Sequence, residues 1–438
     1  MRINIFTGSC IRVALIAALL VTCSQMQSLA ADAAPIEPPP AANKNVPLKI
    51  EAAHCGAGKC GACGNCSKGA GCACRKKART ARPMLSADER AKLVASLRVS
   101  YLKPPQDWPA PAVDPDVKWK ELGLLPPPEF PKDNGFSDEK AELGKLLFFD
   151  PRLSSSRQIA CASCHDPDLS WADGRTTAYG HERQPLARNT PSLLGAAYNK
   201  HSFWDGRASS LEEQIRAVIL NPAEMHSTHE QVIAALNGVA DYRDRFSKCF
   251  GTHEVTLENV AKAIATYERT LLPGRSRFDA FLRGNSQALS DEAVMGLHLF
   301  RTQARCMNCH HGPNFSDNQF HDVGLSYYGR ELEDLGRYAL TSAAEDVGRF
   351  KTPSLRNVSQ TAPYMHNGLF QLEGVLNMYN AGMPTNKRTK NLSGAPAPLK
   401  SKHLEPLKLN RQDLGDLKAF LISLAEPRRR VRAPTLPR

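Results

Sequence analysis

Two short motifs hold the residues with the most distinctive chemistry in this sequence of 438 residues. The run Cys161–His165 reads Cys-Ala-Ser-Cys-His, and the run Cys306–His310 reads Cys-Met-Asn-Cys-His. Cys-x-x-Cys-His is the attachment signature of c-type haem, in which two cysteines form thioethers to the porphyrin and the histidine lies under the iron. Chance would give about 0.01 copies per chain of this composition. We therefore predict two covalently bound c-type haems, with these attachment and iron-ligating residues: Cys161, Cys164, His165, Cys306, Cys309 and His310.

A zinc site or a redox dithiol would use the same types of residue. A structural zinc site needs paired Cys/His clusters that close one tetrahedron, and neither motif has a second pair nearby in the sequence. Haem attachment is therefore the better interpretation. A haem with a fixed pair of ligands only moves electrons, whereas catalysis needs an iron whose sixth position can open and nearby acid–base groups. Two haems in one chain indicate a division between relay and reaction.

The elements that position these motifs are expected to be helices. Ser137 is an expected N-cap for a helix over 138–149. Apolar residues recur near helical spacing over 255–272, 291–300 and 412–424. Convincing alternating strands are missing, so the predicted fold class is mostly α.

Two weak self-similarities indicate a duplicated unit. Gly144-Lys-Leu-Leu-Phe precedes the first motif, and Gly296-Leu-His-Leu-Phe precedes the second. We therefore expect two cytochrome c-like haem domains packed together. The expected organisation is a signal peptide at 1–30, a Pro/Gly/Cys-rich low-complexity extension and linker at 31–136, an N-terminal haem domain at 137–287, a C-terminal haem domain at 288–427 and a basic tail at 428–438.

The net charge of +12 is confined to the ends of the chain. Residues 137–426 hold 33 basic and 33 acidic side chains, so the globular part gives no support for nucleic-acid binding. Residues 1–30 have the basic start, short apolar run and small residues of a secretory signal. No apolar run is long enough to span a membrane. We expect a periplasmic protein; a lipoprotein signal ending at Cys23 fits less well because Thr22 precedes it.

Residues 31–135 hold few large apolar side chains, so we expect no independent core there but a disordered extension. This extension contains six cysteines between Cys55 and Cys74, interleaved with glycines. Their thiolates could bind a soft metal such as Cu(I) or Zn, or export could oxidise them to disulfides. Cys249 is expected to be a buried small hydrophobe, and the basic tail is expected to be solvated.

The sequence resembles the bacterial dihaem cytochrome c peroxidases and their MauG-type relatives over about residues 137–427. The resemblance rests on the haem motifs and on these longer runs: Gly144-Lys-Leu-Leu-Phe-Phe-Asp-Pro-Arg-Leu-Ser, Cys161-Ala-Ser-Cys-His-Asp-Pro, Arg188-Asn-Thr-Pro-Ser, Phe203-Trp-Asp-Gly-Arg-Ala, Thr352-Pro-Ser-Leu-Arg-Asn-Val and Thr361-Ala-Pro-Tyr-Met-His-Asn-Gly. It implies reduction of hydrogen peroxide to water with electrons from a small periplasmic cytochrome c or cupredoxin. The alternative function is MauG-type oxidation of a side chain on a partner protein, and a third is that of a non-catalytic electron carrier. A homodimer is compatible with the sequence.

The resemblance gives the first haem the peroxidatic role. His165 would be its proximal ligand, and His181 falls where these peroxidases keep a removable distal ligand that MauG-type enzymes lack. Gln214 and Glu224 fall at the catalytic distal positions, where a carboxylate can move a proton from one peroxide oxygen to the other. From the residues alone, Glu224 would be an acid at a helix start and His181 a surface residue.

The resemblance gives the second haem the relay role, with His310 as its proximal ligand. Peroxidases carry Met as the sixth ligand of this haem, and MauG-type proteins carry Tyr. The alignment favours Tyr379, with its neighbour Met378 as the alternative. His366 is expected to be structural or adjacent to a haem rather than a ligand.

Two further positions follow from the resemblance. Trp204 matches the tryptophan that lies between the haems and is thought to pass electrons; by itself it would be an ordinary core aromatic. Asn189, Thr361 and Pro363 match a calcium position at the domain interface. Carbonyl and amide oxygens suit that hard cation.

Overall fold

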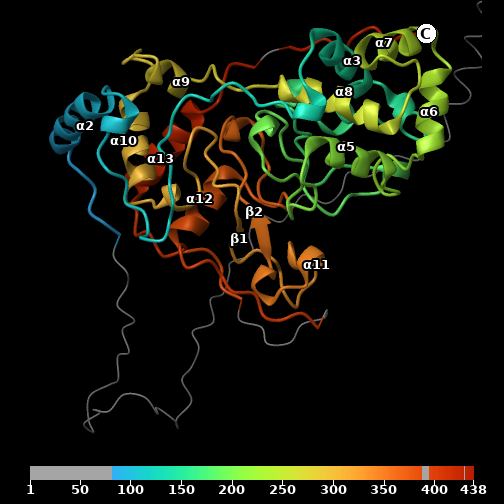
Figure 1. The fold of residues 1–438 in the computed structure, drawn as a ribbon. Coiled ribbons are helices and arrows are strands. Elements are labelled where there is room, and N and C mark those ends of the chain that lie inside the picture. Colours follow the sequence, from blue (N-terminus) through green and yellow to red (C-terminus); the bar gives the residue numbers. More distant parts are fainter. Residues whose placement is uncertain (1–80, 387–393, 429) are drawn as a thin grey trace, which may run out of the picture. The chain divides into compact units, whose positions relative to one another are not determined.

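The computed structural model describes residues 81–386, 394–428 and 430–438, all within one unit of the chain that spans 76–438. The predicted signal peptide, the Cys-rich segment and the first part of the extension lie outside these residues. The described part is mostly helical, which confirms the predicted fold class (Figure 1). No helix in it is long and apolar enough to cross a membrane.

In chain order the α-helices are α2 (Ala87–Tyr101), α3 (Asp138–Phe148), α4 (Cys161–Cys164), α5 (Leu211–Leu220), α6 (His229–Asn237), α7 (Ala240–Phe250), α8 (Leu257–Arg269), α9 (Arg277–Leu282), α10 (Asp291–Arg301), α11 (Tyr338–Thr341), α12 (Leu372–Asn380) and α13 (Arg411–Ser423). Short 3₁₀ helices lie at Pro105–Asp107, Lys132–Asn134, Pro151–Leu153, Pro167–Leu169, His181–Arg183, Ala196–Tyr198, Cys306–Asn308, Ala344–Asp346 and Val358–Gln360. Strands β1 (Phe320–Asp322) and β2 (Arg349–Lys351) form an antiparallel pair in which His321 faces Phe350.

Polar N-caps fix where the main helices begin. Ser137 and Thr256 accept hydrogen bonds of 3.2 and 3.1 Å from main-chain N–H groups three residues later, at the starts of α3 and α8. Ser290 and Asn410 cap α10 and α13 in the same way. Each bond satisfies an N–H group that the helix itself leaves unpaired. The four helices predicted from the sequence are confirmed, with ends within three residues of those expected.

Two hydrophobic cores organise the described residues. The first lies among α3, α5, α6, α7 and α8, and the second among α2, α9, α10 and α13. Leu271 belongs to the first core, whereas Phe278 and Phe281 already belong to the second. The change of core therefore falls before residue 278, and the domain boundary at 287 stays a prediction.

A glycine lies at the close approach of the main helix pair in each core. Helix α3 packs on α8, and α10 packs on α13. A Cβ on Gly144 would lie 1.9 Å from the carbonyl oxygen of Ala263, and one on Gly296 would lie 2.0 Å from that of Asp416. These are the glycines of the two similar pentapeptides. The self-similarity in the sequence therefore corresponds to one packing contact that occurs twice.

The described part of the predicted linker, 81–136, contributes to the second core. Helix α2 buries Val94, Leu97 and Tyr101 there, and Arg90 donates to both carboxylate oxygens of Asp416 at 2.7 and 2.6 Å. The segment forms no core of its own, as expected. The linker prediction is nevertheless wrong for these residues, because a few apolar side chains suffice where a larger core supplies the opposite surface.

The basic tail also packs on the protein. Val431 and Leu436 contact the first core, and Arg152 donates to the carbonyl oxygen of Pro437 at 2.9 Å. The prediction of a solvated tail is therefore wrong for this segment. Its arginines dominated the composition, but its two apolar side chains find a hydrophobic surface.

We expect Gly144→Ala to lower the free energy of unfolding by about 1–3 kcal/mol, the usual cost of overpacking a close contact. Gly415→Ala on α13 is the matched control, because nothing lies within 4 Å of the added Cβ. The control should raise the free energy of unfolding by about 0.5–1 kcal/mol, since alanine is the better helix former. Urea unfolding followed by circular dichroism measures both. Equal effects of the two substitutions would contradict the close crossing.

Candidate functional site

The first motif lies on the wall of a cavity of about 950 Å³. Cys161 is the first and Cys164 the last residue of α4, and His165 is its C-cap. The Nδ1 atom of His165 lies 3.1 Å from the carbonyl oxygen of Trp171, which leaves Nε2 as the nitrogen for a metal. Burial lowers the pKa of His165. The imidazole is therefore neutral at pH 7, the form that binds iron.

The second motif repeats this design on the wall of a smaller cavity of about 260 Å³. Cys306 begins a 3₁₀ turn, and Cys309 follows it. The Nδ1 atom of His310 lies 2.9 Å from the carbonyl oxygen of Phe315, and burial lowers the pKa of His310. Each cavity thus has two thiols and one neutral imidazole with a fixed ring.

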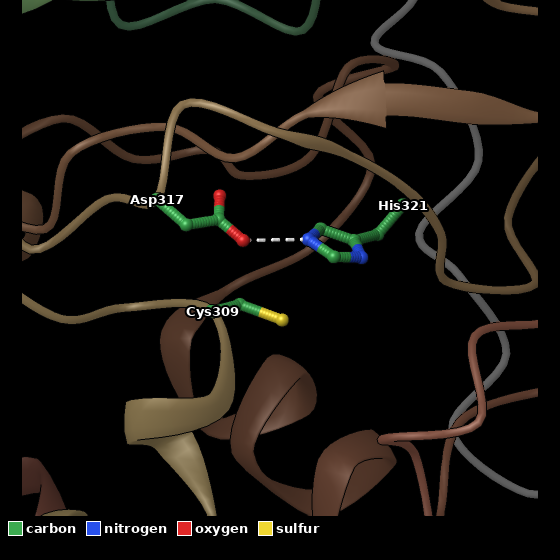
Figure 2. Close-up of side chains that lie close together, drawn as sticks. All are labelled: Cys309, Asp317 and His321. Atoms are coloured by element: carbon green, nitrogen blue, oxygen red, sulfur yellow. Dashed lines mark hydrogen bonds and ion pairs between the residues drawn. The ribbon is translucent and has the colours of Figure 1, made fainter. Parts of the chain in front are cut away.

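This donor set fits haem attachment better than a zinc site. Burial raises the pKa of Cys164 to about 11 and that of Cys306 to about 12. Each motif supplies two sulfurs and one imidazole, one ligand fewer than the four of a structural zinc site. The one cluster of three metal-ligating side chains among the described residues is Cys309, Asp317 and His321 (Figure 2). Asp317 and His321 bind each other there at 2.7 Å, and Cys309 belongs to the haem motif. No tetrahedral set is complete among the residues that the structure describes.

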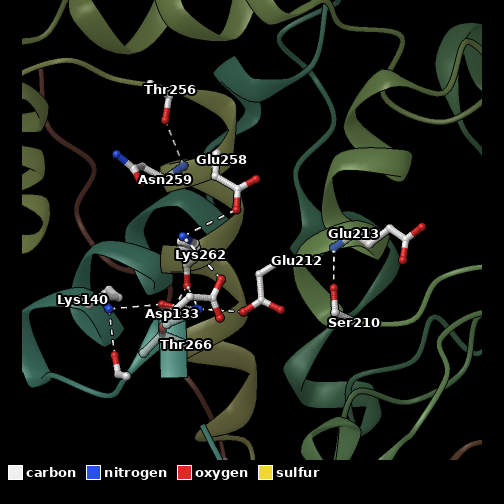
Figure 3. A network of polar contacts seen from close by, with 12 residues as sticks. Asp133, Lys140, Ser210, Glu212, Glu213, Thr256, Glu258, Asn259, Lys262 and Thr266 are labelled. Carbon is white, nitrogen blue, oxygen red and sulfur yellow. Dashed lines mark hydrogen bonds and ion pairs between the residues drawn. The ribbon is translucent and has the colours of Figure 1, made fainter. Parts of the chain in front are cut away.

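A buried polar network holds α5, which carries Gln214, against α8. Arg269 pairs with Glu212 at 2.6 Å, and Asn134 donates to Glu212 at 2.7 Å and to the carbonyl oxygen of Lys262 at 3.0 Å. Figure 3 shows Glu212 beside Lys262 within this network. A buried charge is costly without a partner. The pair therefore fixes the position of α5 at the first cavity.

Gln214 and Glu224 both line the first cavity. Gln214 lies one turn after Leu211, which lines the same wall. Glu224 lies in the turn after α5, where its main-chain N–H donates to the carbonyl oxygen of Asn221 at 3.1 Å. Burial raises the pKa of Glu224, against the positive charge of Arg207. The cavity thus presents a carboxyl group and an amide to a small polar molecule.

His181 lies outside the first cavity, whose wall includes its neighbour Gly180. The His181 ring meets the His226 ring edge to face, with centroids 4.3 Å apart. Its main-chain N–H donates to the carbonyl oxygen of Ala223 at 3.1 Å. Only glycine fits at 180, because a Cβ there would lie 1.9 Å from the same oxygen. A role for His181 as distal ligand therefore requires this loop to move.

Nine residues line both cavities and form what we call the shared wall: Asn189, Thr190, Pro191, Ser192, Asn199, Trp204, Lys351, Pro353 and His366. The indole Nε1 of Trp204 donates to the carbonyl oxygen of Asn189 at 2.8 Å. The Trp204 and His366 rings lie 6.4 Å apart in a T-shaped arrangement. Burial lowers the pKa of His366 to about 4, so it is neutral. Trp204 therefore lies on a wall common to both cavities, and its role between two haems stays a prediction.

Tyr379 lines the second cavity, whereas its neighbour Met378 is absent from that wall. Both lie on α12, where Val375 and Leu376 share the cavity face with Tyr379. Residues three and four apart lie on one face of a helix, and adjacent residues do not. Burial raises the pKa of Tyr379. Helix α12 thus turns a phenol toward the second motif.

The three residues expected at a calcium position, Asn189, Thr361 and Pro363, all line the second cavity. The amide nitrogen of Asn189 donates to the carbonyl oxygen of Arg175 at 2.8 Å, which leaves its oxygen for an ion. The Thr361 hydroxyl donates to Val358 at 3.3 Å. These groups offer the oxygen ligands that calcium prefers. Calcium binding stays a prediction.

Three side chains near the cavities were not identified from the sequence. Lys351 directly precedes one of the family-like runs, Glu268 lies on α8 and His226 follows Glu224 closely in sequence. Charged residues are mostly exposed in proteins, and nothing in the spacing of these three distinguishes them from solvated ones. Only the fold shows that Lys351 and Glu268 line a cavity.

Several known proteins are similar to this chain in sequence and in fold. The family model for di-haem cytochrome c peroxidase matches residues 138–287. The methylamine utilization protein MauG of Methylorubrum extorquens is 40% identical over 309 residues, covering 70% of this chain and 84% of that protein. Cytochrome c551 peroxidase of Nitrosomonas europaea is 41% identical over 231 residues, covering 52% and 69%. The crystal structure of a MauG-like protein associated with microbial copper homeostasis matches with a TM-score of 0.64 and 30% identity, covering 72% and 96%.

The buried acid Glu268 makes stability depend on pH. Its side chain lines the first cavity, and Oε2 has no hydrogen-bond partner among the described residues. Burial raises its pKa to about 8, although Arg269 opposes the shift. Between its ordinary pKa of 4.5 and about 8, the folded protein keeps a proton that the unfolded chain has lost. Stability therefore falls as the pH rises through this window.

We expect Glu268→Gln to flatten that pH dependence by on the order of 2 kcal/mol between about pH 5 and about pH 8. Denaturant unfolding across this range measures the effect. Glu258→Gln, an exposed change on the same helix, should keep the wild-type slope. Parallel loss of stability in wild type and Glu268→Gln would show that Glu268 ionises normally.

Proposed function

The chain belongs to the family of di-haem cytochrome c peroxidases and MauG proteins, and we propose that it reduces hydrogen peroxide to water at its first haem. Family membership implies two c-type haems, at Cys161–His165 and Cys306–His310. The second haem would supply single electrons, and Trp204 would lie on their path to the first. The observation that carries the proposal is the pair Glu224 and Gln214 on the wall of the larger cavity.

The inequality of the two cavities supports this division of labour. The first holds about 950 Å³ and the second about 260 Å³, so the first is the more spacious of the two. The first wall also carries an acid–base group and an amide, whereas α12 closes the second with Tyr379 and apolar side chains. Substrate chemistry therefore belongs to the first site and relay to the second.

The residues of the first cavity supply proton transfer. The haem iron, when bound, provides the site where peroxide binds and is reduced. Glu224 takes a proton from one peroxide oxygen and returns it to the other, which leaves as water. Two electrons from the donor and two protons from solvent then convert the remaining oxygen to the second water. The raised pKa of Glu224 suits this exchange, since the carboxylate then accepts a proton more readily than an ordinary one does. The amide of Gln214 orients the peroxide by hydrogen bonding.

We assign His181 as the gate of the first haem. Its position beside His226 leaves the cavity to Gln214 and Glu224. Ligation would require the main chain at Gly180 to leave Ala223. We therefore propose that this gate is open at rest, so that peroxide reacts without prior one-electron reduction.

MauG-type oxidation of a side chain on a partner protein is the second candidate. The presence of Tyr379 on the second cavity wall favours it, because MauG-type proteins carry tyrosine at that haem. Steady-state assays separate the two. A peroxidase oxidises about two reduced cytochromes per peroxide over many turnovers, and no turnover with any small donor would contradict the first proposal.

The remaining assignments complete the proposal. The donor is a small periplasmic cytochrome c or cupredoxin, reached after export through the signal at 1–30. Calcium binds through Asn189, Thr361 and Pro363 and couples the two haem domains at 137–287 and 288–427. The homodimer remains a proposal that sedimentation can test.

We expect Glu224→Gln to slow the reaction with peroxide by about 10²–10⁴-fold, the usual contribution of acid–base catalysis. In the wild type the rate should fall as the pH drops through the Glu224 pKa, which burial raises above its ordinary value, because the carboxylate must first accept a proton. Stopped-flow absorbance of the haems measures the rate. The control is Glu213→Gln on α5, whose carboxylate accepts a hydrogen bond from the Ser209 hydroxyl. An unchanged rate and pH profile in Glu224→Gln would require another proton path.

We expect Tyr379→Phe to change the optical and electron paramagnetic resonance spectra of the second haem, because it removes the proposed ligand oxygen. Met378→Leu should leave both spectra unchanged. The reverse pattern would assign the ligand to Met378. Because the residues are adjacent on α12, the two variants disturb the same helix and serve as controls for each other.

A further inference from the structure

Lys351 ends strand β2 and belongs to the shared wall. Its main-chain N–H donates to the carbonyl oxygen of Trp204 at 2.7 Å. The preceding residue, Phe350, stacks on His366 with ring centroids 3.7 Å apart. Lysine and tryptophan are therefore held together at a fixed part of the wall between the cavities.

Among the described residues, no carboxylate oxygen lies within 4.0 Å of the Lys351 ammonium group. Asp317, whose charge acts on Lys351, is bound to His321 at 2.7 Å. Asp205 and Asp334 line the first cavity, but both pair with Arg188, at 2.6 and 2.7 Å respectively. Burial lowers the pKa of Lys351 to about 8, which is the cost of a cation without a close anion.

We propose that Lys351 binds a haem propionate at the shared wall and holds a positive charge between the two haems. Each haem brings two propionate carboxylates, and a half-buried ammonium without a protein partner is the group they would neutralise. The shared wall borders both cavities; the first motif lines one of them and the second motif lines the other. This inference rests on the two haems that family membership implies and not on peroxide chemistry.

The charge has a consequence for electron transfer. Reduction removes one positive charge from the iron, so a nearby cation stabilises the reduced haem. Lys351 therefore raises the midpoint potential of the haem whose propionate it binds. Because it lies beside Trp204, this effect acts on the path between the haems.

The test compares midpoint potentials of the holoprotein in Lys351→Met, Lys351→Arg and Lys248→Met. Arginine keeps the positive charge, and Lys248→Met removes the same charge from an exposed position on α7 that lines neither cavity. Optical redox titration without peroxide gives the potential of each haem, and pyridine haemochrome absorbance gives the haem content. Because no peroxide is used, an inactive protein would refute the proposed function without affecting this test.

Lys351→Met should lower the potential of at least one haem, while Lys351→Arg and Lys248→Met keep wild-type values. Wild-type potentials for both haems in Lys351→Met would overturn the proposal. If that variant does not accumulate with two haems, Lys351→Gln provides the neutral substitution. Loss of haem from both neutral variants but not from Lys351→Arg would also support the pairing, and loss from all three would count against it.

Discussion

A hydrogen bond that fixes one histidine ring underlies each half of this protein. The Nδ1 atoms of His165 and His310 lie 3.1 and 2.9 Å from main-chain carbonyl oxygens six and five residues later. Each bond leaves Nε2 for iron and fixes the ring on which a haem would rest. With two cysteines adjacent to each histidine, this orientation decides which side chains face the two sides of the haem. The roles proposed for the distal groups, the shared wall and the gate all depend on this orientation of the histidine rings.

The same local design serves two unequal sites. At the first cavity a carboxyl and an amide line open space, whereas at the second α12 turns a phenol toward the second motif. The shared wall gives the two a common boundary in which Trp204 is hydrogen-bonded at both its ring and its main chain. The two halves thus have similar helix crossings at Gly144 and Gly296 but unlike cavities.

Much of this could be predicted from the sequence, because short-range patterns determine it. The haem motifs, the capped helices and the paired glycines are each set by residues close in the chain. The predictions that failed were those made from composition. By composition the linker containing Val94 and the tail containing Leu436 are typical of solvated segments, but both pack against a hydrophobic core formed by other parts of the chain. The orientation of His181 toward His226 and the burial of Lys351 depend on contacts between distant segments, and no local pattern carries that information.

The central claim is that the first haem is open to peroxide and differs in ligation from the second. Low-temperature electron paramagnetic resonance of the protein as isolated tests it most directly, because the spectrum separates high-spin irons with an open or weakly held sixth position from low-spin irons with two strong ligands. We predict one high-spin ferric haem, whose signal disappears when a ligand is added to the first cavity. The other haem should be low-spin, and its signal should change in Tyr379→Phe. Two low-spin haems, the first of them ligated by two histidines, would contradict it.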